Sequence, residues 1–195
     1  MSSVIISGDT SGAITVSAPA VSGTNTLTLQ AATATNAVNK LETALAYNWN
    51  GLTTNTSLDF TGIPSWCKKI TVMFSGVSGS GTSNFLLQIG DAGGIENTGY
   101  SGGSFNAGAT ANSTAGFDLT AQNLAAQVWG GSITLTNLSG NIWCQSGVIS
   151  GQSGGYIGAS GGAKELSATL DRVRITTVNG IDTFDAGTIN LLLEG

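Results

Sequence analysis

Residues 58–195 consist largely of short runs in which apolar and polar side chains alternate, with glycine-rich stretches between them. The apolar positions of these runs are Ile70, Val72 and Phe74; Phe85, Leu87 and Ile89; Ile133 and Leu135; Leu166, Ala168 and Leu170; Val173 and Ile175; and Ile189, Leu191 and Leu193. A period of two is typical of a strand that buries one face, whereas a helix needs a longer repeat. About eight or nine such strands predict an all-β fold, a jelly-roll-like β-sandwich over residues 51–195.

Glycine-containing turns predict how these strands connect. Asn179-Gly180 is the strongest hairpin signal, because both residue types accept the positive φ that a type I′ turn requires. Ser139-Gly140-Asn141 predicts a second hairpin. Gly130-Gly131 lies inside an apolar run and therefore predicts a β-bulge.

Residues 1–50 form a separate segment whose apolar residues are too sparse to build a core. Short β-like bursts surround Val4, Ile6, Ile14, Val16, Leu27 and Leu29. One helix is predicted over residues 36–47, where Val38, Leu41 and Leu45 recur with helical spacing. We expect these nine side chains to serve attachment and oligomerisation, in a homotrimer, because the segment cannot bury itself. The alternative for the helix is a connector that packs on the adjoining domain.

The composition excludes several functional classes. The chain has no histidine, which removes Ser-His-Asp and Cys-His catalysis and any imidazole metal site. Six Lys and Arg against eleven Asp and Glu give a net charge of −5, which disfavours nucleic acid as a partner. No apolar run reaches the ~18 residues that a membrane span needs. We therefore expect no metal, no cofactor and no membrane insertion.

The beginning of the chain and its two cysteines bear on where it is made. No basic stretch followed by an apolar one comes after Met1, so synthesis in a cytosol is expected. Cys67 and Cys144 are then expected to be small buried side chains, although one disulfide between them stays an alternative. Only 9% of the residues are charged, and a surface rich in Thr, Ser, Asn and Gly suits repeated contact between proteins.

Two motifs suggest chemistry. The nucleophile-elbow pattern G-x-S-x-G occurs at residues 99–103, 151–155 and 158–162, but it needs a strand, a helix and a histidine base. Its repetition follows from the glycine and serine content, so a hydrolase is rejected. Asp91 and Glu96 flank Gly93-Gly94 and are the best candidates for a pair of carboxylates that could cleave a glycan. Such an enzyme would require the two carboxylates to converge in a groove.

Two long segments, residues 90–116 and 150–163, are too rich in Gly, Ser and Ala to be strands throughout, and are expected as surface loops. They carry Tyr100, Phe105 and Tyr156. Rigid aromatic side chains on adaptable loops are typical of a glycan-binding platform. The alternative is that these aromatic rings fold back onto the edge of the core.

Several segments resemble the β-rich domain of tail-fibre-like and other virion structural proteins of tailed bacteriophages. Residues 58–64 (LDFTGIP) and 68–78 (KKITVMFSGVS) are similar to its opening, and residues 166–180 (LSATLDRVRITTVNG) and 182–190 (DTFDAGTIN) to its close. Residues 12–16 (GAITV) and 23–29 (GTNTLTL) are similar to β-repeats at the start of such fibres. The resemblance implies a homotrimeric, non-enzymatic virion protein and no particular receptor.

The expected function is therefore that of a short, fibre-like trimer of a phage particle, assembled in the host cytoplasm. Its amino-terminal segment would bind other virion proteins of the tail or capsid, and its β-sandwich would contact the host surface, including surface glycans. Two alternatives are a capsid-decoration protein (a head fibre or cement protein that stabilises the shell) and a carbohydrate-binding module.

Overall fold

The computed structural model describes residues 3–7, 13–17, 55–125, 127–152 and 154–195. Within these residues every regular element is a β-strand, which confirms the all-β class. The predicted helix 36–47 lies outside the described residues, as do Leu27, Leu29, Val38, Leu41 and Leu45. The predicted domain boundary at residue 50 lies outside them too.

The amino-terminal segment contributes two short strands. Strand β1 (Ser3–Ser7) pairs with β2 (Ala13–Ser17) in an antiparallel ladder. The register places Val4 opposite Val16 and Ile6 opposite Ile14. Four of the predicted attachment residues thus occupy matched positions of one two-stranded sheet.

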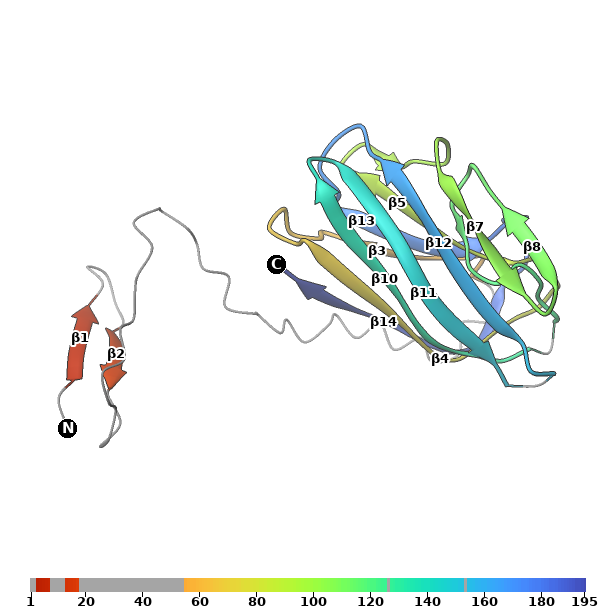
Figure 1. Cartoon of the computed structure of the whole chain (residues 1–195), viewed down its shortest axis with the longest axis horizontal. Helices are drawn as coiled ribbons and strands as arrows, with labels where there is room; N and C mark the ends of the chain where they lie inside the picture. Colours follow the sequence, from red (N-terminus) through yellow and green to blue (C-terminus); the bar gives the residue numbers. More distant parts are fainter. Residues whose placement is uncertain (1–2, 8–12, 18–54, 126, 153) are drawn as a thin grey trace. The chain divides into compact units, whose positions relative to one another are not determined.

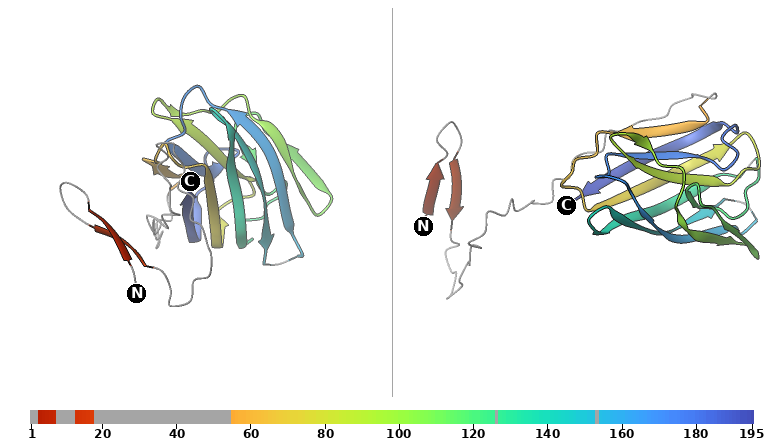
Figure 2. Two further views of the ribbon diagram at one scale, coloured as in Figure 1. Left: turned by 60° about the vertical axis from the view of Figure 1, so that its left-hand side comes forward. Right: turned by 90° about the horizontal axis from the view of Figure 1, so that it is seen from above.

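The remaining strands form two antiparallel sheets (Figure 1). The larger, seven-stranded sheet consists, in spatial order, of β14 (Phe184–Glu194), β4 (Lys69–Gly79), β10 (Trp129–Ser139), β11 (Ile142–Gly151), β12 (Ile157–Glu165), β7 (Ser101–Asn106) and β8 (Ala109–Asn112). The smaller sheet runs β3 (Ser57–Thr61), β13 (Arg172–Thr177), β5 (Phe85–Asp91) and β6 (Gly94–Ile95), and β9 (Phe117–Asp118) also pairs with β5. Figure 2 shows the two sheets as stacked layers.

One hydrophobic core lies between the sheets. The alternating residues predicted for it are buried, among them Ile70, Val72, Phe74, Phe85, Leu87, Ile89, Ile133, Leu135, Val173, Ile175, Ile189 and Leu191. Phe85 of the smaller sheet and Phe184 of the larger one bring their ring centroids to 5.3 Å. Burying a side chain of this size stabilises the fold by roughly 1.5–3 kcal/mol, so this shared core holds the two layers together.

Two of the predicted turn features are confirmed. The hairpin between β10 and β11 pairs Ser139 with Ile142 across Gly140 and Asn141. The β10–β4 ladder shifts register between Trp129 and Gly131, where Gly130-Gly131 predicted a bulge. Gly131 has φ = 135°, a conformation that favours glycine.

The prediction of surface loops over residues 90–116 and 150–163 is wrong for much of both segments. The first contains β6, β7 and β8, and the second contains most of β12. Their glycines allow close pairing of β7 with β12, since a Cβ at Gly102 would lie 2.5 Å from the carbonyl oxygen of Gly161.

Two further local predictions are wrong. Asn179-Gly180 does not close a hairpin, because β13 belongs to the smaller sheet and β14 to the larger one. Oδ1 of Asn179 instead accepts hydrogen bonds from the backbone N of Ile181 and of Asp182, each across 3.1 Å, and so holds a turn that crosses between the sheets. Residues 166–170 form no strand, although Leu166 and Leu170 are buried. The leucine at each end of this loop is buried in the core. The loop therefore has apolar residues at the same spacing as a strand, although it is not one.

The β domain has two ends, defined here by the loops that meet there. At the near end, Phe184 N donates to the carbonyl of Asn55 (3.0 Å) and Val178 N to that of Asn84 (3.0 Å). At the far end, Lys68 N donates to the carbonyl of Glu194 (2.7 Å) and Leu166 N to that of Asn141 (3.1 Å). The chain thus begins its β domain at the near end and finishes at the far end.

Strand β14 is the outermost strand of the larger sheet, so only one of its edges pairs with a described strand. The backbone N–H of Leu191 donates a hydrogen bond to Oδ1 of the neighbouring Asn190, with an N–O distance of 2.9 Å.

Candidate functional site

The larger sheet turns one face toward the core and the other, called here the outer face, away from it. Because directly paired residues of adjacent strands lie on the same side of a sheet, the registers define transverse rows across this face. One row runs Asn190, Met73, Ser132, Val148, Ala159, Phe105 and Thr110. The next row runs Leu192, Thr71, Thr134, Ser146, Gly161, Gly103 and Asn112. Neither row contains a charged residue.

Apart from the buried Lys164, the charged side chains of the larger sheet lie at its two ends. Asp185 lies near the start of β14 at the near end, and the others lie at the far-end margin of the outer face. Lys69 Nζ lies 2.8 Å from Oε2 of Glu194, and Glu165 is exposed at the end of β12. Other charges belong to the smaller sheet, where Arg174 Nε lies 2.6 Å from Oδ1 of Asp59. A chain with a net charge of −5 therefore has one broad uncharged face.

Exposed apolar side chains gather on this face toward the near end. Phe105 is 53% exposed, Val148 50% and Ile157 55%. Val148 and Phe105 flank Ala159 on its two neighbouring strands, and Ile157 lies two positions before Ala159 on β12. These four residues are called the outer patch. Contiguous exposed apolar residues of this kind mark contact sites more often than isolated ones do.

The three predicted glycan-binding aromatics are not brought together. Tyr100 is buried at the far end, where its ring meets that of Phe117 edge-on with centroids 4.9 Å apart. Its hydroxyl donates to the carbonyl of Glu96 (2.9 Å) and accepts from the backbone N of Ile89 (2.7 Å), and burial raises its pKa. Phe105 lies on the outer face, whereas Tyr156 is half-buried against the core. The alternative of rings that fold back onto the core therefore holds for Tyr100 and Tyr156.

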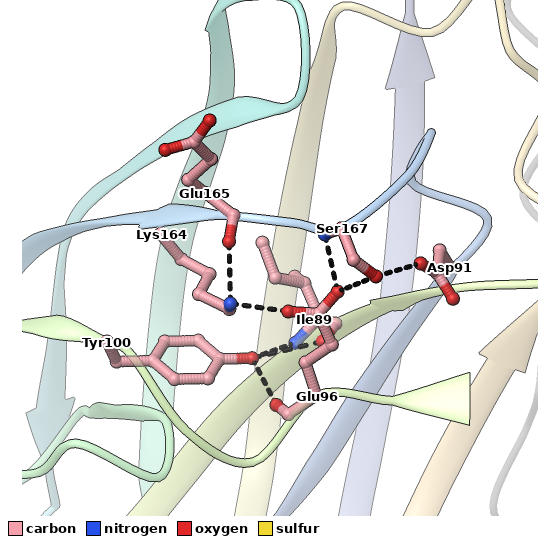
Figure 3. A network of polar contacts seen from close by, with 7 residues as sticks. All are labelled: Ile89, Asp91, Glu96, Tyr100, Lys164, Glu165 and Ser167. Carbon is pink, nitrogen blue, oxygen red and sulfur yellow. Dashed lines mark hydrogen bonds and ion pairs between the residues drawn. The ribbon is translucent and has the colours of Figure 1, made fainter. Parts of the chain in front are cut away.

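A network of charged and polar side chains joins the two sheets at the far end (Figure 3). Oε1 of Glu96 accepts hydrogen bonds from the backbone N (2.7 Å) and Oγ (2.8 Å) of Ser167, and its other carboxylate oxygen pairs with Lys164 Nζ. Ser167 Oγ also lies 2.7 Å from Oδ2 of Asp91. We call Asp91, Glu96, Lys164 and Ser167 the far-end clasp. Lys164 and Ser167 were not predicted as members, because no local pattern connects them to the acidic pair.

The clasp keeps both of its carboxylates ionised. The hydrogen bonds from Ser167 and from the backbone of Gly93 hold the pKa of Asp91 below its ordinary value. Burial raises the pKa of Glu96, but the hydrogen bonds from Lys164 and Ser167 outweigh burial and leave this pKa lowered. A glycosidase pair needs one carboxyl group whose pKa is raised, so that it can donate a proton. Asp91 and Glu96 converge on Ser167, but in an arrangement suited to binding two loops together.

The other motifs from the sequence fall on strands. Ser101 begins β7 and Ser160 lies within β12, so neither occupies the turn between a strand and a helix that a nucleophile elbow needs. Ser153 lies outside the described residues. Cys67 is a free, buried thiol, as predicted, and burial raises its pKa. The predicted burial is wrong for Cys144, which is also free but only partly buried, because it shares the outer face with Ser146 and Val148.

The described residues contain neither a metal-binding cluster nor a membrane-spanning helix. No group of three or more Cys, Asp and Glu side chains in this part of the chain could hold a metal ion. The same residues contain no helix long and apolar enough to cross a membrane.

Comparison with known proteins finds no protein family, no curated protein and no solved structure that matches the chain.

Proposed function

We propose that the chain is a non-enzymatic structural protein of a phage particle that acts as a short, fibre-like homotrimer. Residues 1–50 attach it to another virion protein, and residues 51–195 project as a jelly-roll-like sandwich that contacts the host surface. The observation that carries the proposal is the uncharged outer face of the larger sheet. The resemblance of residues 58–64, 68–78, 166–180 and 182–190 to the β-rich domain of phage tail-fibre-like and other virion structural proteins supports it.

The outer face supports self-association through its charge. Copies that carry five net negative charges repel one another wherever charged surfaces approach. The two central rows of the outer face avoid this repulsion, because they contain no charged residue. They consist of Thr, Ser, Gly, Ala and Asn together with Met73, Leu192, Val148 and Phe105. The centres of interfaces between proteins are depleted of charge in the same way.

The amino-terminal strands support an attachment role. A two-stranded antiparallel sheet is marginal in water without further strands or a packing partner. Strands β1 and β2 make one such ladder of five residue pairs. Packing on sister chains or on another virion protein would stabilise this ladder.

The oligomeric state of the full chain tests the proposal. Native mass spectrometry and sedimentation velocity at micromolar concentration are expected to give three times the 19.5 kDa mass of one chain. A monomeric chain under these conditions would contradict the proposal.

The place of the protein on a particle is tested by antibodies against residues 55–195. Labelling at the tail, with a handful of copies per particle, is expected for a fibre. Hundreds of copies spread over the shell would instead identify a capsid-decoration protein, which the same uncharged face would serve. Particles that bind no antibody would remove both functions.

A further inference from the structure

The outer patch offers a more specific site than the uncharged face as a whole. Its three large side chains project from three consecutive strands: Val148 from β11, Ile157 from β12 and Phe105 from β7. Each is half or more exposed, although residues of these types are usually buried. Ala159 lies between Val148 and Phe105 on the intervening strand and adds no bulk.

On the basis of the homotrimer proposed above, we infer that the outer patches of the three copies converge at the three-fold axis. The partner of the patch is thus the same patch on sister chains. Its centre, Ala159, lies nearest to the axis, and the large side chains of each copy cover those of the next.

The charges argue for a second copy as the partner. A partner that binds through charged side chains would find charged residues elsewhere on the molecule. Lys69 and Glu194 lie at the far-end margin, and Arg174 and Asp59 lie on the smaller sheet. The patch and the rows beside it offer no ion pair. A charged surface pressed against this apolar patch would bury charges without partners, which is unfavourable. The patch therefore matches another uncharged, apolar surface, and a second copy of this chain supplies one.

A sugar ligand fits the patch less well. Glycan sites place hydrogen-bonding side chains around an aromatic ring. The residues that directly face or diagonally adjoin Phe105 are Ala159, Gly161, Ile157, Thr110 and Asn112. The two polar ones, Thr110 and Asn112, both belong to β8, so hydrogen-bonding side chains flank the ring on one side only. Asn112 and Asn190, the amide side chains of the two rows, stand at the margins of the sheet.

Cross-linking of a single cysteine tests the inference. Ala159→Cys in a Cys144→Ser background places a thiol at the centre of the patch, and the buried Cys67 stays in place. Treatment of the full chain with a short bismaleimide is expected to yield covalent dimers on a denaturing gel. The matched control is Ile181→Cys, at a residue that is 74% exposed in the turn between β13 and β14, off the sheet. We expect it to cross-link at least tenfold more slowly.

A charge-pairing experiment provides a second readout. Val148→Asp and Val148→Lys each bring like charges together at the axis, so each variant alone is expected to associate at least tenfold more weakly than the unaltered chain. An equimolar mixture of the two variants is expected to regain association. Ile181→Asp adds the same charge elsewhere and is expected to leave association unchanged.

The outcomes separate the inference from the proposed function. A monomeric unaltered chain would overturn both. A trimeric chain in which Ala159→Cys cross-links no faster than Ile181→Cys would overturn the inference alone, and the patch would then face another partner. Equal association of the Val148 variants and the unaltered chain, with no gain on mixing, would do the same.

Discussion

Glu96 accepts two hydrogen bonds from Ser167 at one carboxylate oxygen, one from the backbone N at 2.7 Å and one from Oγ at 2.8 Å. The first residue follows the short strand β6 of the smaller sheet, and the second follows β12 of the larger one. This contact, together with Lys164 and Asp91, ties the two layers at the far end.

The far-end clasp predicts sensitivity to acid. Because the pKa values of Glu96 and Asp91 are lower in the folded chain than in the unfolded one, the clasp stabilises the fold fully above the unfolded values of about 4. This stabilisation is lost as the pH falls through the folded pKa values. The free energy of unfolding, measured in urea by tryptophan fluorescence, is expected to fall between about pH 5 and pH 3.

Glu96→Gln should weaken that pH dependence, because a glutamine has no proton to gain. Glu165→Gln, at an exposed residue on the strand that precedes Ser167, is the control and should retain the acid dependence of the unaltered chain. Identical acid profiles for Glu96→Gln and the unaltered chain would show that Glu96 does not hold the clasp.

Shortening the Asp118 side chain to alanine is expected to lower the free energy of unfolding by a large amount. Its carboxylate is buried and accepts hydrogen bonds from Ser104 Oγ (2.6 Å), Asn84 Nδ2 (2.9 Å) and Ala121 N (2.8 Å). Asp118→Ala would leave these donors without their acceptor and should cost about 3 kcal/mol. Urea unfolding measures the loss, and Glu165→Ala should stay within about 0.5 kcal/mol of the unaltered chain. A change below about 1 kcal/mol for Asp118→Ala would be inconsistent with these hydrogen bonds.

Substitutions of Tyr100 are expected to change the stability of the fold rather than ligand binding. Tyr100→Phe keeps the ring against Phe117 but removes the hydroxyl that serves Ile89 and Glu96, and should cost about 1–2 kcal/mol. Tyr100→Ala also empties the ring site and should cost about 3–5 kcal/mol. Thermal unfolding by circular dichroism should rank the two variants in this order. A Tyr100→Ala variant as stable as the unaltered chain would place the ring outside the core.

The backbone of β14 at Gly187 is expected to tolerate only glycine. Its φ is 98°, and a Cβ there would lie 2.5 Å from the backbone of Gly76 on β4. Gly187→Ala should therefore lower the midpoint of thermal unfolding by several degrees, because both the conformation and the contact are unfavourable. Gly130→Ala is the matched control, since a Cβ there makes only ordinary contact at 3.6 Å. The β14–β4 ladder shifts register between Ala186 and Thr188, which brings Gly187 close to Gly76. Equal midpoints for the two variants would argue against this close approach.

The sequence predicted those parts of the fold that depend on local alternation. Ile70, Val72 and Phe74 alternate because β4 buries one face, and the same reasoning placed β5, β13 and β14. The partner of a strand is not a local property. Asn179-Gly180 correctly predicted a turn, but it wrongly predicted that the strands on either side pair with each other. No residue near the turn indicates that β14 joins the other sheet.

The candidate site was less accessible from the sequence. Asp91 and Glu96 stood out by their spacing, but Ser167 lies 76 residues from Asp91 and joins it only through the packing of the two sheets. The outer patch likewise draws Phe105, Val148 and Ile157 from three strands whose order in the sheet differs from their order in the chain. Of these three, Phe105 alone was marked by the sequence, as a candidate glycan-binding aromatic residue.

The outermost position of β14 has a consequence for solubility. A long edge strand that contains Leu191, Leu192 and Leu193 is a template on which other chains could extend the sheet into amyloid-like fibrils. Only 9% of the residues are charged, so charge repulsion gives this edge little protection. If copies of the folded chain aggregate, strand addition at β14 is therefore the expected route.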